Sequence, residues 1–375
     1  MSVFKIFNTR NVIYVQNLNV IYSAISLIVL YFIVKQLFKE EIIHKIALIF
    51  ITFFSIYFTF FSAHVYGNIP GLMFGLIALL FTLKFVDSNK LWHLIIVAVS
   101  ITFSYLLKNN YEIFLFAIII ELLLKALRDL KLKPILGIFI ICITVFGIKA
   151  IVYKTFEKTT NYSLDGGVPV TSYIYMGIAK PVTLAPGWYT GDVENIYKDS
   201  NYNKEKSGEI TKKLMDKRLE YLKNNPSYTA DYFYQKLQTT WLNPTFQTLW
   251  CSTPSIALEQ NPDYNAYIAS QKLIISILCG TAFKIEERIM DIYQITVFLT
   301  STLALLLLFK QGELEKALLP IVFLGGFIFH LIWETKSIYV LQYYYLLIPF
   351  ATYGVYKLFK IIDNKIEKIG KKSKN

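Results

Sequence analysis

Charge, disulfide chemistry and recognisable catalytic fingerprints are all scarce in this sequence. Charged residues make up 17% of its 375 positions, whereas 55% are hydrophobic and the mean hydropathy is +0.45. There are three cysteines, which match no metal spacing and indicate no disulfide framework: Cys142, Cys251 and Cys279. No phosphate-binding loop, nucleophile elbow, zinc-protease motif or dinucleotide fingerprint stands in a suitable context. The composition excludes a soluble globule. The sequence indicates no cofactor, and a need for a divalent metal stays open.

Long apolar runs are what the sequence does contain. A helix that crosses a bilayer needs roughly 17–25 apolar residues, and runs near that length predict about nine transmembrane helices. They cover residues 12–34, 46–63, 71–86, 91–107, 113–127, 134–153, 289–309, 318–333 and 338–359. The runs 71–86 and 113–127 are slightly short, which indicates a tilt or shielding by neighbouring helices. The predicted fold class is an all-α polytopic membrane protein with one long polar segment.

Basic residues in alternate loops set the predicted orientation. Lysines such as Lys39, Lys90, Lys131 and Lys316 follow every second run, and more lysines crowd the C-terminal tail. Loops rich in lysine and arginine stay in the cytoplasm. The pattern places the C-terminus inside and the N-terminus outside, in the plasma membrane of a bacterial cell. Topology and anionic lipid then explain the net charge of +12 without any nucleic-acid partner.

Three regions follow from this division of the chain. Residues 1–153 form a first transmembrane block of about six helices. Residues 289–375 form a second block of about three helices with a basic cytoplasmic tail. Between the two blocks, residues 154–288 are polar and are predicted to lie outside the cell.

The polar region carries its own helical signals. Residues 202–223 and 228–242 have the apolar spacing of amphipathic helices. Residues 272–283 are apolar but too few to cross a bilayer, so this run is predicted to be interfacial or re-entrant. The region is too poor in aliphatic residues for a robust independent domain, and we expect it to rest on the membrane block.

Polar residues at helix ends gather on the predicted outer face. They come from three loops: His64, Tyr66 and Asn68; Lys108, Asn109, Asn110 and Glu112; Glu334 and Lys336. A carboxylate and an ammonium between two membrane helices are costly unless they contact water, each other or a ligand. The long polar segment enters from the same face. We therefore predict a site at the outer membrane surface, covered by a lid-like segment and suited to a lipid-linked substrate.

Each of these features also has a simpler interpretation. Glu334 and Lys336 are also compatible with a solvated loop pair, and Lys108 with an end charge that snorkels to the interface. His64 is more readily an interfacial histidine than a metal ligand, because no second His or carboxylate stands at metal spacing. His330 stands one turn before Glu334 and is spaced to hydrogen-bond it, although simple packing is the better interpretation.

Five segments, taken in order, resemble a known family of enzymes. They are Val65-Tyr-Gly-Asn-Ile-Pro-Gly71, Leu106-Leu-Lys-Asn-Asn110, Ala185-Pro-Gly-Trp-Tyr189, Trp241-Leu-Asn-Pro-Thr-Phe246 and Gly325-Gly-Phe-Ile-Phe-His-Leu-Ile-Trp-Glu-Thr-Lys-Ser337. Their order and spacing resemble the polytopic membrane glycosyltransferases of the GT-C class in Gram-positive bacteria, near family 39, the protein mannosyltransferase-like group. The resemblance extends over nearly the whole chain.

The resemblance implies a function and a set of roles. Such enzymes take a sugar from a polyprenyl-phosphate donor, which resides among the membrane lipids. They transfer it to an envelope glycan, lipid or protein acceptor outside the cell. By this resemblance Lys336 and Lys108 bind the departing phosphate, and Glu334 orients Lys336 or the acceptor. Substrate contacts are expected from Tyr66, Asn68, Asn110, His64, Trp188, Tyr189 and Trp241. The two tryptophans are equally interpretable as anchors at the lipid interface.

The sequence departs from the family pattern in three places. The family carries its catalytic acid in the first outer loop after the first helix, yet residues 1–11 contain neither Asp nor Glu. The pattern also has an acid where Asn68 stands and an arginine where Ile338 stands. With the outward N-terminus, these departures predict an N-terminally truncated GT-C chain, inactive alone or complemented by a separate segment.

Two other functions stay open on the sequence. One is a flippase, polymerase-like protein or transporter for lipid-linked saccharides. The scarcity of charges within the membrane runs argues against it. The other is a non-catalytic scaffold of the cell envelope.

Overall fold

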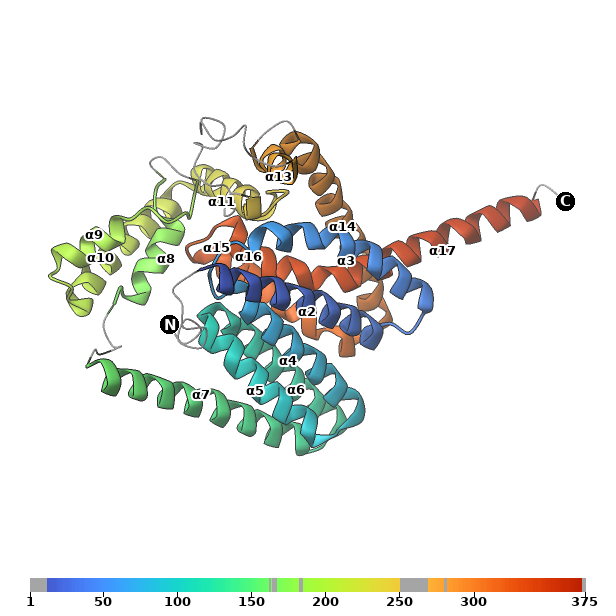
Figure 1. Cartoon of the computed structure of the whole chain (residues 1–375), viewed down its shortest axis with the longest axis horizontal. Helices are drawn as coiled ribbons and strands as arrows, with labels where there is room; N and C mark the ends of the chain where they lie inside the picture. Colours follow the sequence, from blue (N-terminus) through green and yellow to red (C-terminus); the bar gives the residue numbers. More distant parts are fainter. Residues whose placement is uncertain are drawn as a thin grey trace.

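The chain is helical throughout the part that the structure describes. The computed structural model describes residues 12–161, 163, 167–181, 185–249, 269–279 and 282–372, and every regular element in these ranges is a helix (Figure 1). The all-α prediction is therefore confirmed for these residues. Cys251 lies outside them.

Within the described ranges, six helical stretches are long and apolar enough to cross a membrane. They are α2 (Ile13–Leu37), α3 (Glu41–Phe61), α4 (Asn68–Ser88), α7 (Lys133–Thr160), α14 (Phe283–Gln311) and Ser337–Glu367. The last stretch comprises α16 (Ser337–Tyr344), a 3-10 turn (Tyr345–Leu347) and most of α17 (Ile348–Lys372). Three further helices complete the bundle: α5 (Leu91–Leu107), α6 (Glu112–Asp129) and α15 (Leu318–Ile332). The chain is a multi-pass membrane protein, and the count of about nine passes stays a prediction.

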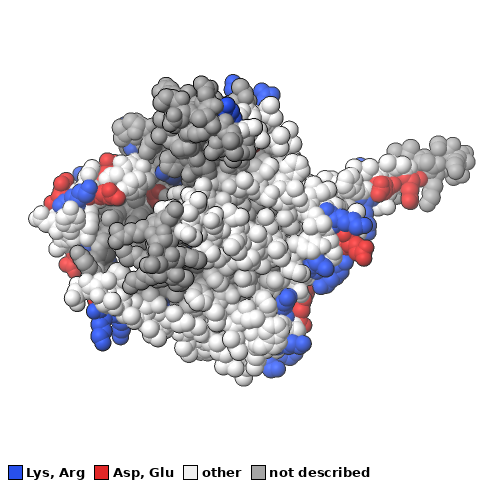
Figure 2. Space-filling model, viewed as in Figure 1, with Lys and Arg blue, Asp and Glu red and all other residues white. Residues whose placement is uncertain are grey.

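Charged side chains avoid the middle of the bundle. On the face shown in Figure 2, lysine, arginine and acidic side chains lie at the end from which α17 projects and at the opposite end, with a broad uncharged belt between. Large apolar side chains are exposed on the bundle, for example Ile95 at 60% and Leu299 at 67%. A helix in lipid satisfies its backbone hydrogen bonds internally and can turn such side chains outward. The belt has the composition that a hydrocarbon layer covers.

The start of α4 differs from the prediction. The apolar run begins at Gly71, but the helix begins at Asn68 and has 21 residues, so it is long enough to span without a special tilt. Pro70 lies in its first turn, where an N–H has no partner within the helix and its absence costs little. Sequence hydropathy missed this turn because Asn68 is polar, although its side chain is buried.

Four helices from the polar region stand beside one end of the bundle, and we call them the lid. They are α8 (Val170–Ile178), α9 (Asp192–Asp199), α10 (Lys204–Asn224) and α11 (Pro226–Trp241). The amphipathic helices predicted at 202–223 and 228–242 are confirmed as α10 and α11. Arg218 joins the lid internally, because its Nε donates to the Ile178 carbonyl at 2.7 Å and its Nη2 donates to the Tyr228 hydroxyl at 2.9 Å. The predicted interfacial run overlaps α13 (Ala269–Cys279), which contacts α14.

Helix α7 packs on the bundle through its first half only. Its buried residues are Pro134, Gly137, Ile141 and Val145, at helical spacing, and none is buried after them. A Cβ at Gly137 would stand 2.7 Å from Cδ1 of Leu94, so glycine permits a close approach to α5. Beyond Val145 the helix runs on toward the lid, along the edge of the molecule (Figure 1). The second half of α7 is therefore a wall with its apolar side chains unburied.

Glycines bring α4 against the segment that follows α5. A Cβ at Gly67 would lie 2.1 Å from the Leu107 carbonyl oxygen, and one at Gly71 would lie 2.3 Å from the Tyr111 ring. The Tyr111 hydroxyl donates to the Asn68 carbonyl at 2.6 Å. The close approach fixes the residues between Leu107 and Tyr111 beside the start of α4.

Gly71→Ala is expected to destabilise the protein, because the added methyl group overlaps the buried Tyr111 ring. Overpacking of this kind costs about 1–3 kcal/mol, which exceeds the gain of about 0.5–1 kcal/mol from replacing a helical glycine. Gly147→Ala on α7 is the matched control, since nothing lies within 4 Å of a Cβ there. Thermal unfolding in detergent should show a lower midpoint for the first variant only. An unchanged midpoint for Gly71→Ala would contradict the close packing.

Candidate functional site

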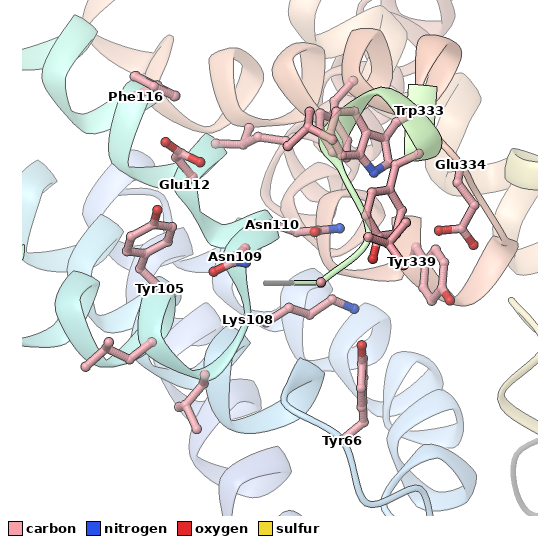
Figure 3. Close-up of a pocket in the computed structure, with 18 of the residues that line it drawn as sticks. Tyr66, Tyr105, Lys108, Asn109, Asn110, Glu112, Phe116, Trp333, Glu334 and Tyr339 are labelled. Carbon is pink, nitrogen blue, oxygen red and sulfur yellow. The ribbon is translucent and has the colours of Figure 1, made fainter. Parts of the chain in front are cut away.

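A cavity of about 940 Å³ opens where three interhelical turns meet (Figure 3). Its walls come from the α3–α4 loop, the end of α5 through the start of α6, the second half of α7, α8 and the α15–α16 turn. Its polar lining includes Lys108, Asn109, Asn110, Glu112 and Glu334. We call the end of the bundle at which these turns lie the cavity end. A charged cavity of this size suits an organic ligand with a polar head.

The Lys108 side chain projects into the cavity from the position directly after the end of α5. Its Nζ donates to Oδ1 of Asn68 at 2.7 Å and lies 4.8 Å from the ring centres of both Tyr66 and Tyr339. Aromatic faces attract cations without neutralising them. Among the described residues Lys108 forms no ion pair. The ammonium is held in place by neutral groups and stays available to an anion.

The surroundings of Lys108 oppose its charge. Burial lowers the pKa of Lys108 to about 7, while the nearby Glu334 acts in the opposite direction. A lysine that is partly desolvated and lacks a counter-ion binds an anion strongly, because the anion restores the lost solvation. Lowered lysine pKa values cluster at functional sites, although structural networks produce them too.

Glu334 occupies the turn between α15 and α16, on the cavity wall opposite Glu112. Its backbone N–H donates to the Tyr173 carbonyl at 3.0 Å, which ties the turn to α8. The side chain is 9% exposed, and its Oε1 has no hydrogen-bond partner among the described residues. Burial raises the pKa of Glu334, and the positive charges of Lys336, Lys108 and Lys236 limit that rise. A carboxylate whose pKa is raised in this way is better suited to accept a proton.

The start of α2 supports the loop that carries His64 and Tyr66. Gln16 donates to the Ala63 carbonyl at 2.9 Å, and Asn19 donates to the Ser62 and His64 carbonyls at 3.1 Å. The His64 ring stacks on Phe61, with ring centres 5.8 Å apart. Burial and the charge of Lys108 lower the pKa of His64 and so favour its neutral form. Within the described ranges, no group of three metal-ligating side chains is present.

The structure brings some of the predicted site residues together and separates others. Tyr66, Lys108, Asn110 and Glu334 line the cavity, and Asn68 contacts Lys108. His330 is buried, and its ring centre lies 5.0 Å from that of Phe329 and 5.7 Å from that of Tyr343.

The remaining predicted residues do not line the cavity. Lys336 lies over the Trp188 ring, with Nζ 5.6 Å from its centre. Burial, together with a hydrogen-bonding contact to Glu194, raises the pKa of Tyr189 to about 12. Trp241 is 5% exposed and packs against the rings of Phe323 and Phe327.

Sequence reasoning placed Glu112 in the outer-face cluster without giving it a role, and it missed Lys236. Glu112 lines the cavity from the first turn of α6. Lys236 is 1% exposed and donates to three backbone carbonyls beside the α15–α16 turn. A signal for Lys236 was present, because Tyr232, Lys236 and Thr240 stand four residues apart and share one buried face of α11.

The fold and the cavity define a multi-pass membrane protein with a charged site at one end of its bundle. Residues 2–151, about two-fifths of the chain, match the family described as dolichyl-phosphate-mannose-protein mannosyltransferase, which is of the GT-C class. The matched part contains Asn68 and Lys108, whereas Glu334 and the lid lie beyond it. Neither the curated proteins nor the solved structures gave a match. The resemblance expected from the sequence is confirmed over the matched residues.

Proposed function

We propose that the chain is a membrane glycosyltransferase that takes a sugar from a polyprenyl-phosphate donor. The observation that carries this proposal is the Lys108 ammonium, which stands in a cavity without an ion-pair partner among the described residues. A phosphate ester supplies the missing negative charge. The match of residues 2–151 to the mannosyltransferase family supports a mannosyl donor as the first to test.

The lining of the cavity supports an amphiphilic donor. Polar groups surround Lys108, whereas Ile113, Phe116 and Phe329 give the cavity an apolar side. Phe116 is 55% exposed on the surface of α6, where lipid chains would contact it. The phosphate and sugar would enter beside Lys108, and the hydrocarbon tail would remain among the helices.

The proposed reaction is a displacement at the anomeric carbon. The oxygen of an acceptor hydroxyl forms a bond to this carbon while the bond between the carbon and the phosphate oxygen breaks. Its proton passes to the Glu334 carboxylate, and the bond electrons leave with the polyprenyl phosphate, whose added negative charge Lys108 stabilises. The acceptor would be a hydroxyl of an envelope glycan, lipid or protein.

We also propose an orientation for the chain. The loops at the end opposite the cavity carry Lys39, Lys90 and Lys131, which favours a cytoplasmic position for that end. The cavity and the lid would then face the outside of the cell. A fluorescent reporter that matures only in the cytoplasm, fused to the C-terminus, should fluoresce, and a dark fusion of normal abundance would overturn the orientation.

Transfer is tested with the purified full chain in lipid nanodiscs. Polyprenyl-phosphate mannose with a labelled sugar is supplied together with an extract of envelope acceptors. We expect release of polyprenyl phosphate and movement of the label to the acceptor fraction. A parallel reaction with Lys108→Met protein serves as the control. If no polyprenyl-phosphate sugar is consumed by the folded wild-type protein, the proposed function is wrong.

The reaction should depend on pH through Lys108. Burial lowers the pKa of Lys108 to about 7, so the free protein loses this positive charge as the pH rises through that value. The ratio kcat/KM reports the free enzyme and should fall about tenfold per pH unit well above 7. Lys108→Arg remains charged and should flatten this alkaline limb. A limb that persists unchanged in the arginine variant would belong to another group, of which Lys236 is the first candidate.

A further inference from the structure

Lys236 is the most deeply buried cation at the cavity end of the described chain. It lies on α11 and is 1% exposed. Its Nζ donates to the Gly177 carbonyl at 2.5 Å and to the Leu331 and Trp333 carbonyls at 2.9 Å each. Gly177 belongs to the last turn of α8, whereas Leu331 and Trp333 stand at the end of α15. One side chain of the lid therefore joins the lid to the bundle.

The chemistry of lysine matches this place. The last carbonyls of a helix have no partner within it and carry the negative end of the helix dipole. An ammonium group offers three donors and a positive charge. Lys236 thus satisfies three terminal carbonyls from two helices at once. Among the described residues it forms no ion pair, and Glu334 is the carboxylate whose charge acts on it.

The backbone around Lys236 is packed closely. Gly187 has φ +79°, in the region that favours glycine, and a Cβ there would lie 2.5 Å from Cε of Lys236. At Gly177 a Cβ would lie 2.0 Å from the Ile332 carbonyl oxygen. These two glycines therefore permit a close approach to the end of α15, at which the α15 carbonyls reach the Lys236 ammonium.

The same contact holds the turn that carries Glu334. The Trp333 carbonyl, which accepts from Lys236, belongs to the peptide unit that leads into Glu334. The next two backbone N–H groups also bond to the lid, from Glu334 to the Tyr173 carbonyl at 3.0 Å and from Thr335 to the Gly187 carbonyl at 2.8 Å. Two successive peptide units, Trp333–Glu334 and Glu334–Thr335, are thus fixed by three hydrogen bonds to this region.

We propose that Lys236 is a positioning residue, whose ammonium fixes the turn from Trp333 to Thr335 against the lid and so sets the place of the Glu334 carboxylate. The effect on catalysis rests on the proposed function, whereas the effect on the turn does not. Without the ammonium, the Leu331 and Trp333 carbonyls lose the donor that Lys236 provides, the Gly177 carbonyl keeps only the Tyr232 hydroxyl at 3.1 Å, and the turn separates from α8. Glu334 then no longer holds one position in the cavity.

Hydrogen–deuterium exchange tests the structural part directly. Lys236→Met removes the donors at similar side-chain length, and Lys213→Met, an exposed lysine of α10, is the matched control. We expect the Glu334 and Thr335 amides to exchange at least about tenfold faster in Lys236→Met, with α4 and α5 unchanged. Unchanged exchange at these two amides would overturn the proposal, and so would a uniform increase over the whole chain.

A second variant covers the case in which Lys236→Met does not fold. Gly187→Ala places a methyl group against Cε of Lys236 and should displace the ammonium while keeping its charge. The same local increase in exchange at Glu334 and Thr335 is expected. A folded Gly187→Ala protein with wild-type exchange at both amides would overturn the proposal that Lys236 fixes the turn.

Kinetics test the positioning role. Donor binding by Lys108 should persist in Lys236→Met, so the donor KM should stay within about threefold while kcat falls at least about tenfold. An unchanged kcat would overturn the positioning role even if exchange increased. Absence of transfer by the wild-type protein would refute the proposed function. The exchange result would still decide whether Lys236 fixes the turn.

Discussion

Lys108→Met should lower kcat/KM for a polyprenyl-phosphate sugar by about 100- to 1000-fold, more than any other single lysine replacement. Loss of one group that stabilises developing charge typically costs about that factor, or about 3–4 kcal/mol. Lys108 is expected to reach this range because Asn68, Tyr66 and Tyr339 hold its ammonium in the cavity before any ligand arrives. Preorganised charge acts without the cost of reorganisation.

Two other lysines provide the comparison for Lys108. Lys336→Met removes the second predicted phosphate ligand, which lies over Trp188 and does not line the cavity. It should reduce kcat/KM by less than about tenfold, through its distant charge alone. Lys213→Met, on the exposed side of the lid, should have no effect. Donor affinity can be measured separately by competition with polyprenyl phosphate. A larger loss for Lys336→Met than for Lys108→Met would reverse the assignment of the phosphate ligand.

Glu334→Gln should lower kcat by about 100-fold or more, because general acid–base groups contribute about 10²–10⁴-fold to the rate. The amide keeps the size of the side chain and can still hydrogen-bond the acceptor, but it does not accept a proton. Lys108 remains in place, so the KM for the donor should change by less than about threefold. Initial rates at saturating acceptor over a range of donor concentrations separate the two constants.

Glu112→Gln is the matched control for Glu334→Gln, since Glu112 is the other carboxylate among the described residues that line the cavity. Glu334 is the more buried of the two, and burial raises its pKa toward the range of an effective base. We expect only a small effect at Glu112. If the loss of kcat follows Glu112 instead, the proton acceptor is on α6 and Glu334 has only a supporting role.

The helices were largely predictable from the sequence, because lipid-facing helices reveal themselves through the length of their apolar runs. Their ends were less predictable where packing overrides hydropathy. Asn68 looks like a loop residue, yet it starts α4 because Tyr111 and Lys108 satisfy its backbone and side-chain oxygens. That partnership joins residues about 40 positions apart and leaves no local signal.

The cavity was predictable in part. Lys108, Tyr66 and Glu334 follow alternate apolar runs, so the parity of the helices placed them at one end. Lys236 was missed because lysine on an amphipathic helix usually faces solvent, and its partners are backbone carbonyls that carry no sequence signature. Trp241 had two equal interpretations, and only tertiary structure could show its ring against Phe323 and Phe327.

The unburied second half of α7 has a consequence for how substrate supply is counted. Tyr153 lines the cavity from this half and is 38% exposed, as is Phe116 to 55% on α6, so in the proposed membrane arrangement the cavity wall would border the bilayer. A donor that diffuses in the plane of the membrane meets this wall without passing through water. Its relevant concentration is then its mole fraction among the lipids, and added inert lipid dilutes it as solvent would dilute a soluble substrate. Turnover in the cell would follow the composition of the membrane more closely than the total amount of donor.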